Sequence, residues 1–307
     1  MRLATTISIL TIAVGTLTPI AISVGASAAP TTVATVATVA SSDSVAASDS
    51  IVVTLNEYSF TVAGTLKAGG TIRFRNIGKE GHIADVIKLL PGKTVADVKK
   101  ALDAGKAAAL KTVGEEIKLP GAILSPGNSV ELTVPTLAAG HYALVCFFAS
   151  EKDGKPHFKH GMVGEFTVVT AKAKTPVADA TYTINPGKSM TGPTALKAGH
   201  HTLEVNVGPG GAVLEPVLLA GARGDTVTMI KKRVDEVFAS ADRGVYPPGS
   251  GAKLAKSLIW ASGDLQAVRK IYIGIDVKPG FYFFAAIDTT AAKLPDPLQE
   301  QVAITVT

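Results

Sequence analysis

Short apolar segments with a period of two residues restrict the fold of this chain more than any other feature. From Ser50 onward these segments are rich in β-branched and aromatic residues, and Gly, Pro and Asn separate them. Strands with one buried face produce this alternation, and the separating residues are typical of turns. The pattern predicts an all-β protein built from Greek-key β-sandwiches. The clearest segments are residues 51–55, 58–62, 71–75, 129–134, 141–145 and 165–169.

One segment has a helical period instead. Within Thr94–Leu102, the apolar residues Val95, Val98 and Leu102 recur at intervals of three and four. This spacing places them on one face of a helix. We therefore expect a short helical insert between strands of the first sandwich.

The second half of the chain repeats the order of the first. Residues 50–170 and 178–307 share motifs in the same sequence order, and residues 171–177 form a short linker between them. Shared order and spacing predict an internal duplication, and each half is long enough for a sandwich with its own helical insert. The corresponding segments are 76–82 with 206–212, 94–100 with 226–232 and 140–146 with 280–286.

The N-terminus has the features of a targeting segment. The apolar run Ile7–Val24 precedes the small residues Ala26-Ser27-Ala28, which predicts a secretory signal peptide over residues 1–28. An uncleaved membrane anchor is the alternative, but Thr, Ser and Gly interrupt the run. Residues 29–49 are a linker rich in Thr, Ala and Ser. We expect a secreted protein, extracellular or in the cell envelope, with no membrane span after cleavage.

Charge and cysteine content narrow the function further. The formal net charge is +5, and the Lys and Arg residues are scattered, so we expect no nucleic-acid partner. No sequence feature specifies an oligomeric state. Cys146 is the one cysteine, so a secreted form has no internal disulfide. It is a free thiol, an intermolecular bridge or a metal ligand, or else a buried inert thiol.

The surroundings of Cys146 favour a metal ligand. It ends an apolar segment, His157 and Met162 follow closely, and His82 lies upstream in the same half. Two His, one Cys and one Met make up a blue-copper electron-transfer site, with a trigonal His₂Cys base and a long axial Met. His160 is an alternative to His157.

The second half lacks this donor set. Ala212 stands at the position of His82, and Ala286 stands at that of Cys146. A purely structural His and Cys would have less reason to be absent together, so the difference favours metal binding in the first half. No His follows His201 and no His-x-His occurs, so we expect no copper-enzyme catalysis in this chain.

With these motifs the first half resembles the cupredoxins, such as plastocyanin, azurin and the type 1 copper domain of nitrite reductases. The Asn-containing loop before the first His, the Gly-x-Tyr-x-x-x-Cys strand and the His-x₄-Met ending all occur here, within residues 51–169. The resemblance implies one type 1 copper in the first domain, single-electron transfer between redox protein partners, and a second cupredoxin-like domain without metal ligands. The implied ligands are His82, Cys146, His157 and Met162.

Two features depart from a compact cupredoxin, namely the helical insert and the ten residues between Cys146 and His157. We expect residues 149–154 to form an exposed hairpin-like tip, and Phe147, Phe148 and Phe158 to form an apolar rim that excludes water. Alternatives to electron transfer are a metal-free binding or structural module of the cell envelope, and copper storage or delivery. Zinc accepts Cys and His but rarely a thioether.

Overall fold

The computed structural model describes residues 46–104, 110–186, 188–209, 214–221, 258–262, 269–288 and 301–307, with isolated positions between 226 and 249. From residue 44 on, the chain forms one compact unit. The expected signal peptide, most of the linker at 29–49 and Ala212 lie outside the described residues. Of the helical insert expected in the second half, the structure describes isolated positions, and Thr228, Met229, Lys232 and Glu236 among them are helical.

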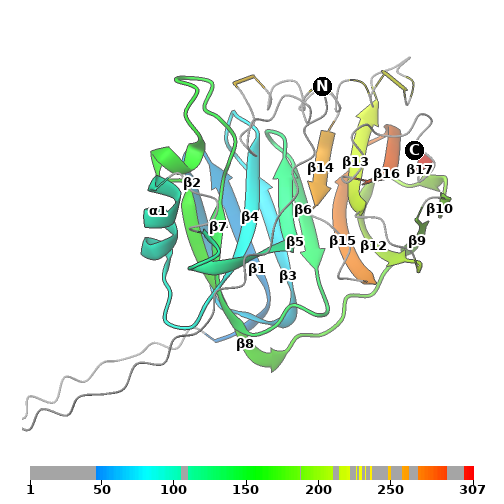
Figure 1. The fold of residues 1–307 in the computed structure, drawn as a ribbon. Coiled ribbons are helices and arrows are strands. Elements are labelled where there is room, and N and C mark those ends of the chain that lie inside the picture. The colour runs from blue at the N-terminus through cyan, green and yellow to red at the C-terminus, as the bar shows by residue number, and fades with distance from the viewer. Residues whose placement is uncertain are drawn as a thin grey trace, which may run out of the picture. The chain divides into compact units, whose positions relative to one another are not determined.

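The first half is a β-sandwich, as the alternating segments predicted (Figure 1). One sheet pairs β1 with β2 in antiparallel and with β3 in parallel orientation, and β3 with β6. The other sheet pairs β4 with β5 and β7, and β7 with β8. The strands are β1 (Ser48–Asn56), β2 (Ser59–Ala63), β3 (Leu66–Asn76), β4 (His82–Leu89), β5 (Gly114–Leu124), β6 (Ser129–Thr133), β7 (Gly140–Val145) and β8 (Val163–Lys172).

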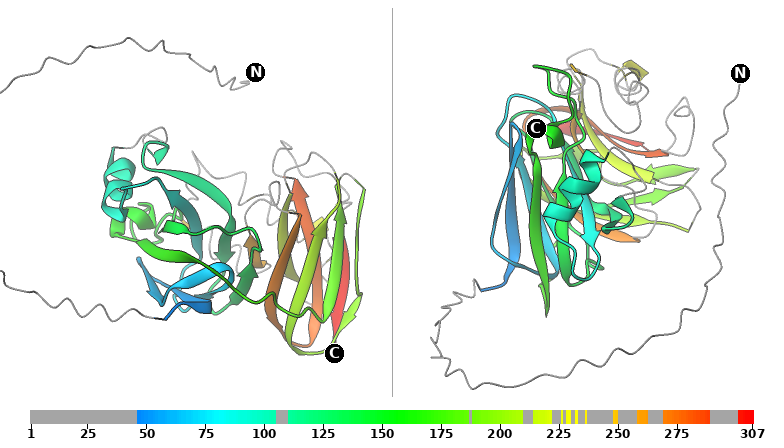
Figure 2. Two further views of the ribbon diagram at one scale, coloured as in Figure 1. Left: turned by 90° about the horizontal axis from the view of Figure 1, so that it is seen from below. Right: turned by 60° about the vertical axis from the view of Figure 1, so that its left-hand side comes forward.

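The helical insert is α1 (Val95–Asp103), close to the predicted range. Thr94 caps its N-terminus, and Thr94 and Asp97 satisfy each other's backbone N–H groups in a capping box. Val98 and Leu102 are buried, and α1 packs on an apolar cluster that includes residues from β4 and β7. Figure 2 (right) shows α1 lying across the outside of this sheet.

The second half repeats the strand pairing of the first, which confirms two sandwiches with related topology. β9 pairs with β12 in parallel as β1 does with β3, and β12 pairs with β15 as β3 does with β6. β13 pairs with β14 and β16, as β4 does with β5 and β7. The strands are β9 (Ala180–Asn185), β10 (Ser189–Thr191), β11 (Ala195–Leu196), β12 (Gly199–Val207), β13 (Leu214–Gly221), β14 (Leu258–Ser262), β15 (Lys270–Val277), β16 (Gly280–Asp288) and β17 (Gln301–Val306).

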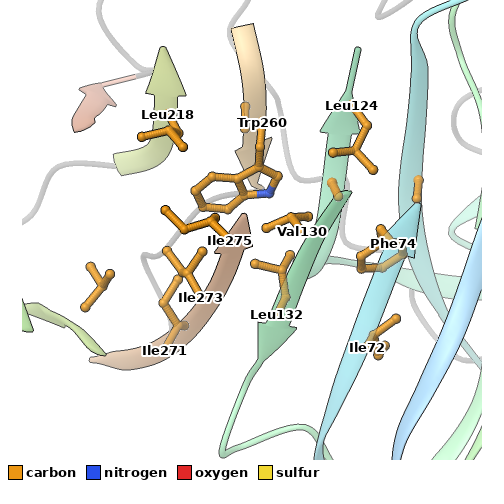
Figure 3. Close-up of a cluster of buried hydrophobic side chains, with 14 of the residues drawn as sticks. Ile72, Phe74, Leu124, Val130, Leu132, Leu218, Trp260, Ile271, Ile273 and Ile275 are labelled. Carbon is orange, nitrogen blue, oxygen red and sulfur yellow. The ribbon is translucent and has the colours of Figure 1, made fainter. Parts of the chain in front are cut away.

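Hydrogen-bonded strands join the two sandwiches. β14 pairs with β5, with Trp260 opposite Leu124, and β15 pairs with β6, with Ile273 opposite Leu132. Side chains from both halves form one apolar cluster around the buried Trp260 (Figure 3). The hydroxyl of Ser125, buried at the end of β5, donates to the carbonyl of Leu258 at 2.7 Å. The second sandwich therefore supports β5, the strand next to the one that begins with His82.

Within the described residues, no helix has both the length and the apolar character needed to cross a bilayer.

Candidate metal centre

Three donor side chains from distant parts of the chain converge in the first sandwich. His82 begins β4, Cys146 directly follows β7, and His157 begins the 3₁₀ helix η1 (His157–His160). The Nδ1 atoms of the two histidines lie 3.1 Å apart, and Cys146 Sγ lies 3.9 Å from His82 Nδ1 and 3.4 Å from His157 Nδ1. All three residues are 0% exposed. In the described part of the chain, this is the one group of three or more His, Cys or acidic residues whose ligand atoms lie within 4.8 Å of one another.

The loop before His82 is fixed by the buried Asn76. Its amide nitrogen donates to the carbonyls of Glu80 and Leu124 at 2.9 and 3.0 Å, and its side-chain oxygen accepts from the N–H of Gly78 at 2.9 Å. Gly78 leaves room for the imidazole, because a Cβ there would lie 2.9 Å from His82 Nε2. Asn76 and Gly78 together hold His82 at the beginning of β4.

Backbone hydrogen bonds close the segment from Cys146 to Met162, which carries the other two donors, into a compact loop. Cys146 N–H donates to the carbonyl of Met162 at 3.3 Å, and Met162 N–H donates to that of His157 at 3.0 Å. Phe158 N–H donates back to the carbonyl of Cys146 at 3.1 Å. The N–H of Ile83 lies 3.4 Å from Cys146 Sγ, a contact that would stabilise a thiolate.

The structure shows which of the two alternative imidazoles, His157 or His160, lies with the other donors. His157 lies beside Cys146, whereas His160 points to Asp153, with Nε2 3.0 Å from Oδ1, and its side chain is 24% exposed. Met162 is fully buried and directly precedes β8. Its role as an axial ligand stays a prediction.

The three phenylalanines of the expected aromatic rim divide between two apolar clusters. Phe147 and Phe158 contact each other and pack against the cluster beneath α1, and only Phe148 belongs to the main core. Tyr58 lies edge-on to the His157 ring, with ring centroids 5.2 Å apart, and its hydroxyl lies 2.6 Å from Ser150 Oγ.

Glu57 and Glu80 also lie at the site, and no sequence motif marked them. Glu57 accepts from the N–H groups of Lys79 and Glu80. Glu80 Oε2 lies 2.8 Å from His157 Nε2. The position of Glu80, two residues before His82, was the one feature of the sequence that could have placed it near the donors.

Burial keeps the donor groups neutral. It lowers the pKa of His82 to about 3, with the neighbouring His157 ring as a further cause, and it also lowers the pKa of His157. Burial raises the pKa of the Cys146 thiol to about 12. Neutral imidazole is the form that binds metals, whereas the thiol must lose its proton to do so.

The donor set fits a single soft or borderline metal ion. With metal–nitrogen bonds of about 2.0 Å and metal–sulfur bonds of about 2.3 Å, donors around one ion lie roughly 3.1–3.8 Å apart. The observed separations of 3.1 and 3.4 Å fall in this range, and the third, 3.9 Å between Cys146 Sγ and His82 Nδ1, lies just above it. Thiolate and imidazole donors together suit copper and zinc. The strand pairing confirms the all-β sandwich fold expected from the sequence.

No protein-family model and no curated protein matches the chain. Among solved structures, the chain is similar to a dithionite-reduced auracyanin from Roseiflexus castenholzii, at 24% identity over 40% of this chain and 99% of that chain, with a TM-score of 0.28. It is similar to auracyanin A, a blue copper protein of Chloroflexus aurantiacus, at 14% identity over 41% of this chain and 98% of that chain, with a TM-score of 0.27. It is also similar to a blue copper oxidase from Nitrosomonas europaea, at 12% identity over 84% of this chain and 76% of that chain, with a TM-score of 0.20.

Proposed function

We propose that this chain is a secreted blue-copper protein that binds one type 1 copper in its first sandwich and carries single electrons between redox protein partners. The observation that carries the proposal is the buried convergence of His82 Nδ1, His157 Nδ1 and Cys146 Sγ. Two imidazoles and one thiolate are the equatorial donors of such a site. The buried Met162 is proposed as the axial fourth donor.

Copper bound here would supply a one-electron couple, Cu(I)/Cu(II). The protein contributes donors whose positions are set by backbone hydrogen bonds, so that both oxidation states meet nearly the same geometry. His82 is fixed through Asn76, and Cys146 and His157 are fixed through the closed segment that ends at Met162. Burial of all three donors excludes water and raises the strength of each electrostatic contact.

The second sandwich is proposed to be a relative that binds no metal. Ala286, the counterpart of Cys146, lies buried in β16 opposite Pro216 of β13. A methyl group there offers no ligand atom. Secretion rests on the signal peptide expected at residues 1–28.

Metal analysis and a visible spectrum of the purified, copper-loaded chain test the proposal. We expect one copper per chain and a strong visible band that bleaches on reduction and returns on oxidation. Cys146→Ser and His157→Ala should remove the band, whereas His160→Ala, which alters an imidazole outside the donor cluster, should leave it in place. A wild type that binds no copper would support the metal-free module, and tight Cu(I) binding without reversible cycling would support storage or delivery.

A further inference from the structure

The outer nitrogen of the His157 ring has a carboxylate partner. Glu80 Oε2 lies 2.8 Å from His157 Nε2, the Glu80 side chain is 14% exposed, and the ring itself is buried. Glu80 Oε2 also accepts from the N–H of Glu151 at 3.2 Å. The carboxylate therefore links the loop before His82 to the loop that carries His157.

Glu80 is held in place from both sides of its own backbone. Its N–H donates to Glu57 Oε1 at 3.1 Å, and its carbonyl accepts from the amide of Asn76 at 2.9 Å. One short loop thus carries a donor of the cluster, His82, and the partner of another donor, His157. This arrangement lets the loop fix two donors at the same time.

The contact determines which nitrogen of His157 carries the proton. A carboxylate oxygen can only accept, so in a neutral imidazole the N–H lies on Nε2. The Nδ1 atom then has a free lone pair, and it is Nδ1 that lies 3.4 Å from Cys146 Sγ and 3.1 Å from His82 Nδ1. The hydrogen bond to Glu80 thus leaves Nδ1, the ring nitrogen that faces the other donors, unprotonated and able to bind a metal.

We propose that Glu80 is a positioning residue of the metal centre, which holds His157 with its proton on Nε2 and its Nδ1 lone pair toward Cys146. The proposal rests on the proposed function in so far as the metal is copper. Glu80 also closes the outer edge of the ring, and Tyr58 covers one side.

Three variants of the full chain test the role of Glu80. Glu80→Ala removes the acceptor, and Glu80→Gln keeps an oxygen that can accept the same hydrogen bond. Asp153→Ala is the matched control, because Asp153 makes a carboxylate contact of similar length to His160, an imidazole outside the cluster. The first measurement is ¹⁵N NMR of the histidine rings in metal-free protein, which reports the protonated nitrogen. The second is copper affinity by competition with a chelator.

In wild type and Asp153→Ala, we expect the His157 proton on Nε2. In Glu80→Ala this preference is lost, and copper affinity falls by about 10- to 100-fold, as is typical when a partner of a metal-binding histidine is removed. Glu80→Gln should recover most of both properties. Equal behaviour of Glu80→Ala and Asp153→Ala in both measurements would overturn the proposal, as would a wild-type ring protonated on Nδ1.

The two proposals fail in different ways. If no protein in the series binds copper, the blue-copper function is wrong, and the NMR result still decides whether Glu80 orients His157. If copper binds and gives the visible band in Glu80→Ala with unchanged affinity and unchanged ring protonation, the blue-copper function stands and the role of Glu80 is wrong.

Discussion

Copper uptake by this site is expected to release one proton, and that proton comes from Cys146. Burial raises the pKa of its thiol to about 12, so the thiol is protonated at pH 7, whereas only the thiolate binds a metal. Burial lowers the pKa of His82 to about 3 and also lowers that of His157. Both imidazoles are therefore neutral at pH 7 and release no proton on binding.

The magnitude follows from the separation between the working pH and the thiol pKa. Because one proton is displaced, the affinity for Cu(I) should rise about tenfold for each unit of pH between roughly 7 and 9. Because pH 7 lies about 5 units below the pKa of the thiol, the free-energy cost of removing its proton weakens binding by roughly 7 kcal/mol. The affinity at pH 7 is weaker than the intrinsic affinity of the thiolate site by that amount.

Calorimetric titration in two buffers with different ionisation enthalpies measures the released protons directly, and chelator competition at several pH values measures the slope. Cys146→Ser should bind Cu(I) more weakly and release no proton in this range. Release of no proton by the wild type would show that Cys146 is already a thiolate in the metal-free protein, which would refute the argument from burial. Release of two would show that one imidazole starts protonated.

Two further predictions concern stability. Trp260→Ala, at the junction of the sandwiches, should lower the free energy of unfolding by about 3–5 kcal/mol, because the ring is fully buried. Phe281→Ala, at a partly exposed ring, should lower it by less than about 1 kcal/mol. Equal losses for the two variants in urea denaturation would contradict a core shared by both sandwiches. Metal-free protein should lose stability as pH falls from about 6.5 to 3, since the unfolded chain protonates His82 over that range before the folded chain does. Melting temperatures measured against pH should show a shallower decline for His82→Gln, and identical profiles would argue against a buried neutral imidazole.

Local periodicity predicted six strands of the first sandwich but neither β4 nor β5. Residues 71–75 were predicted from alternation, and they lie within β3, whose side chains alternate between buried and partly exposed. β5 contains Pro120, a residue that disfavours a strand. Pro120 lies where the register between β4 and β5 shifts, between the pairs Ala84–Ala122 and Val86–Ile117, so this part of the ladder needs no N–H from it.

The sequence by itself determined the period of the strands, the capped helix after Thr94 and the types of donor at positions 82, 146 and 157, because these depend on residues close together in the chain. Only the tertiary structure decided that His157 and not His160 lies beside Cys146, that Glu80 accepts from His157 across 77 residues, and that β14 pairs with β5. Each of these outcomes depends on how separate strands pack against one another. A partner brought close by packing has no fixed spacing in the sequence, so no local pattern could indicate it.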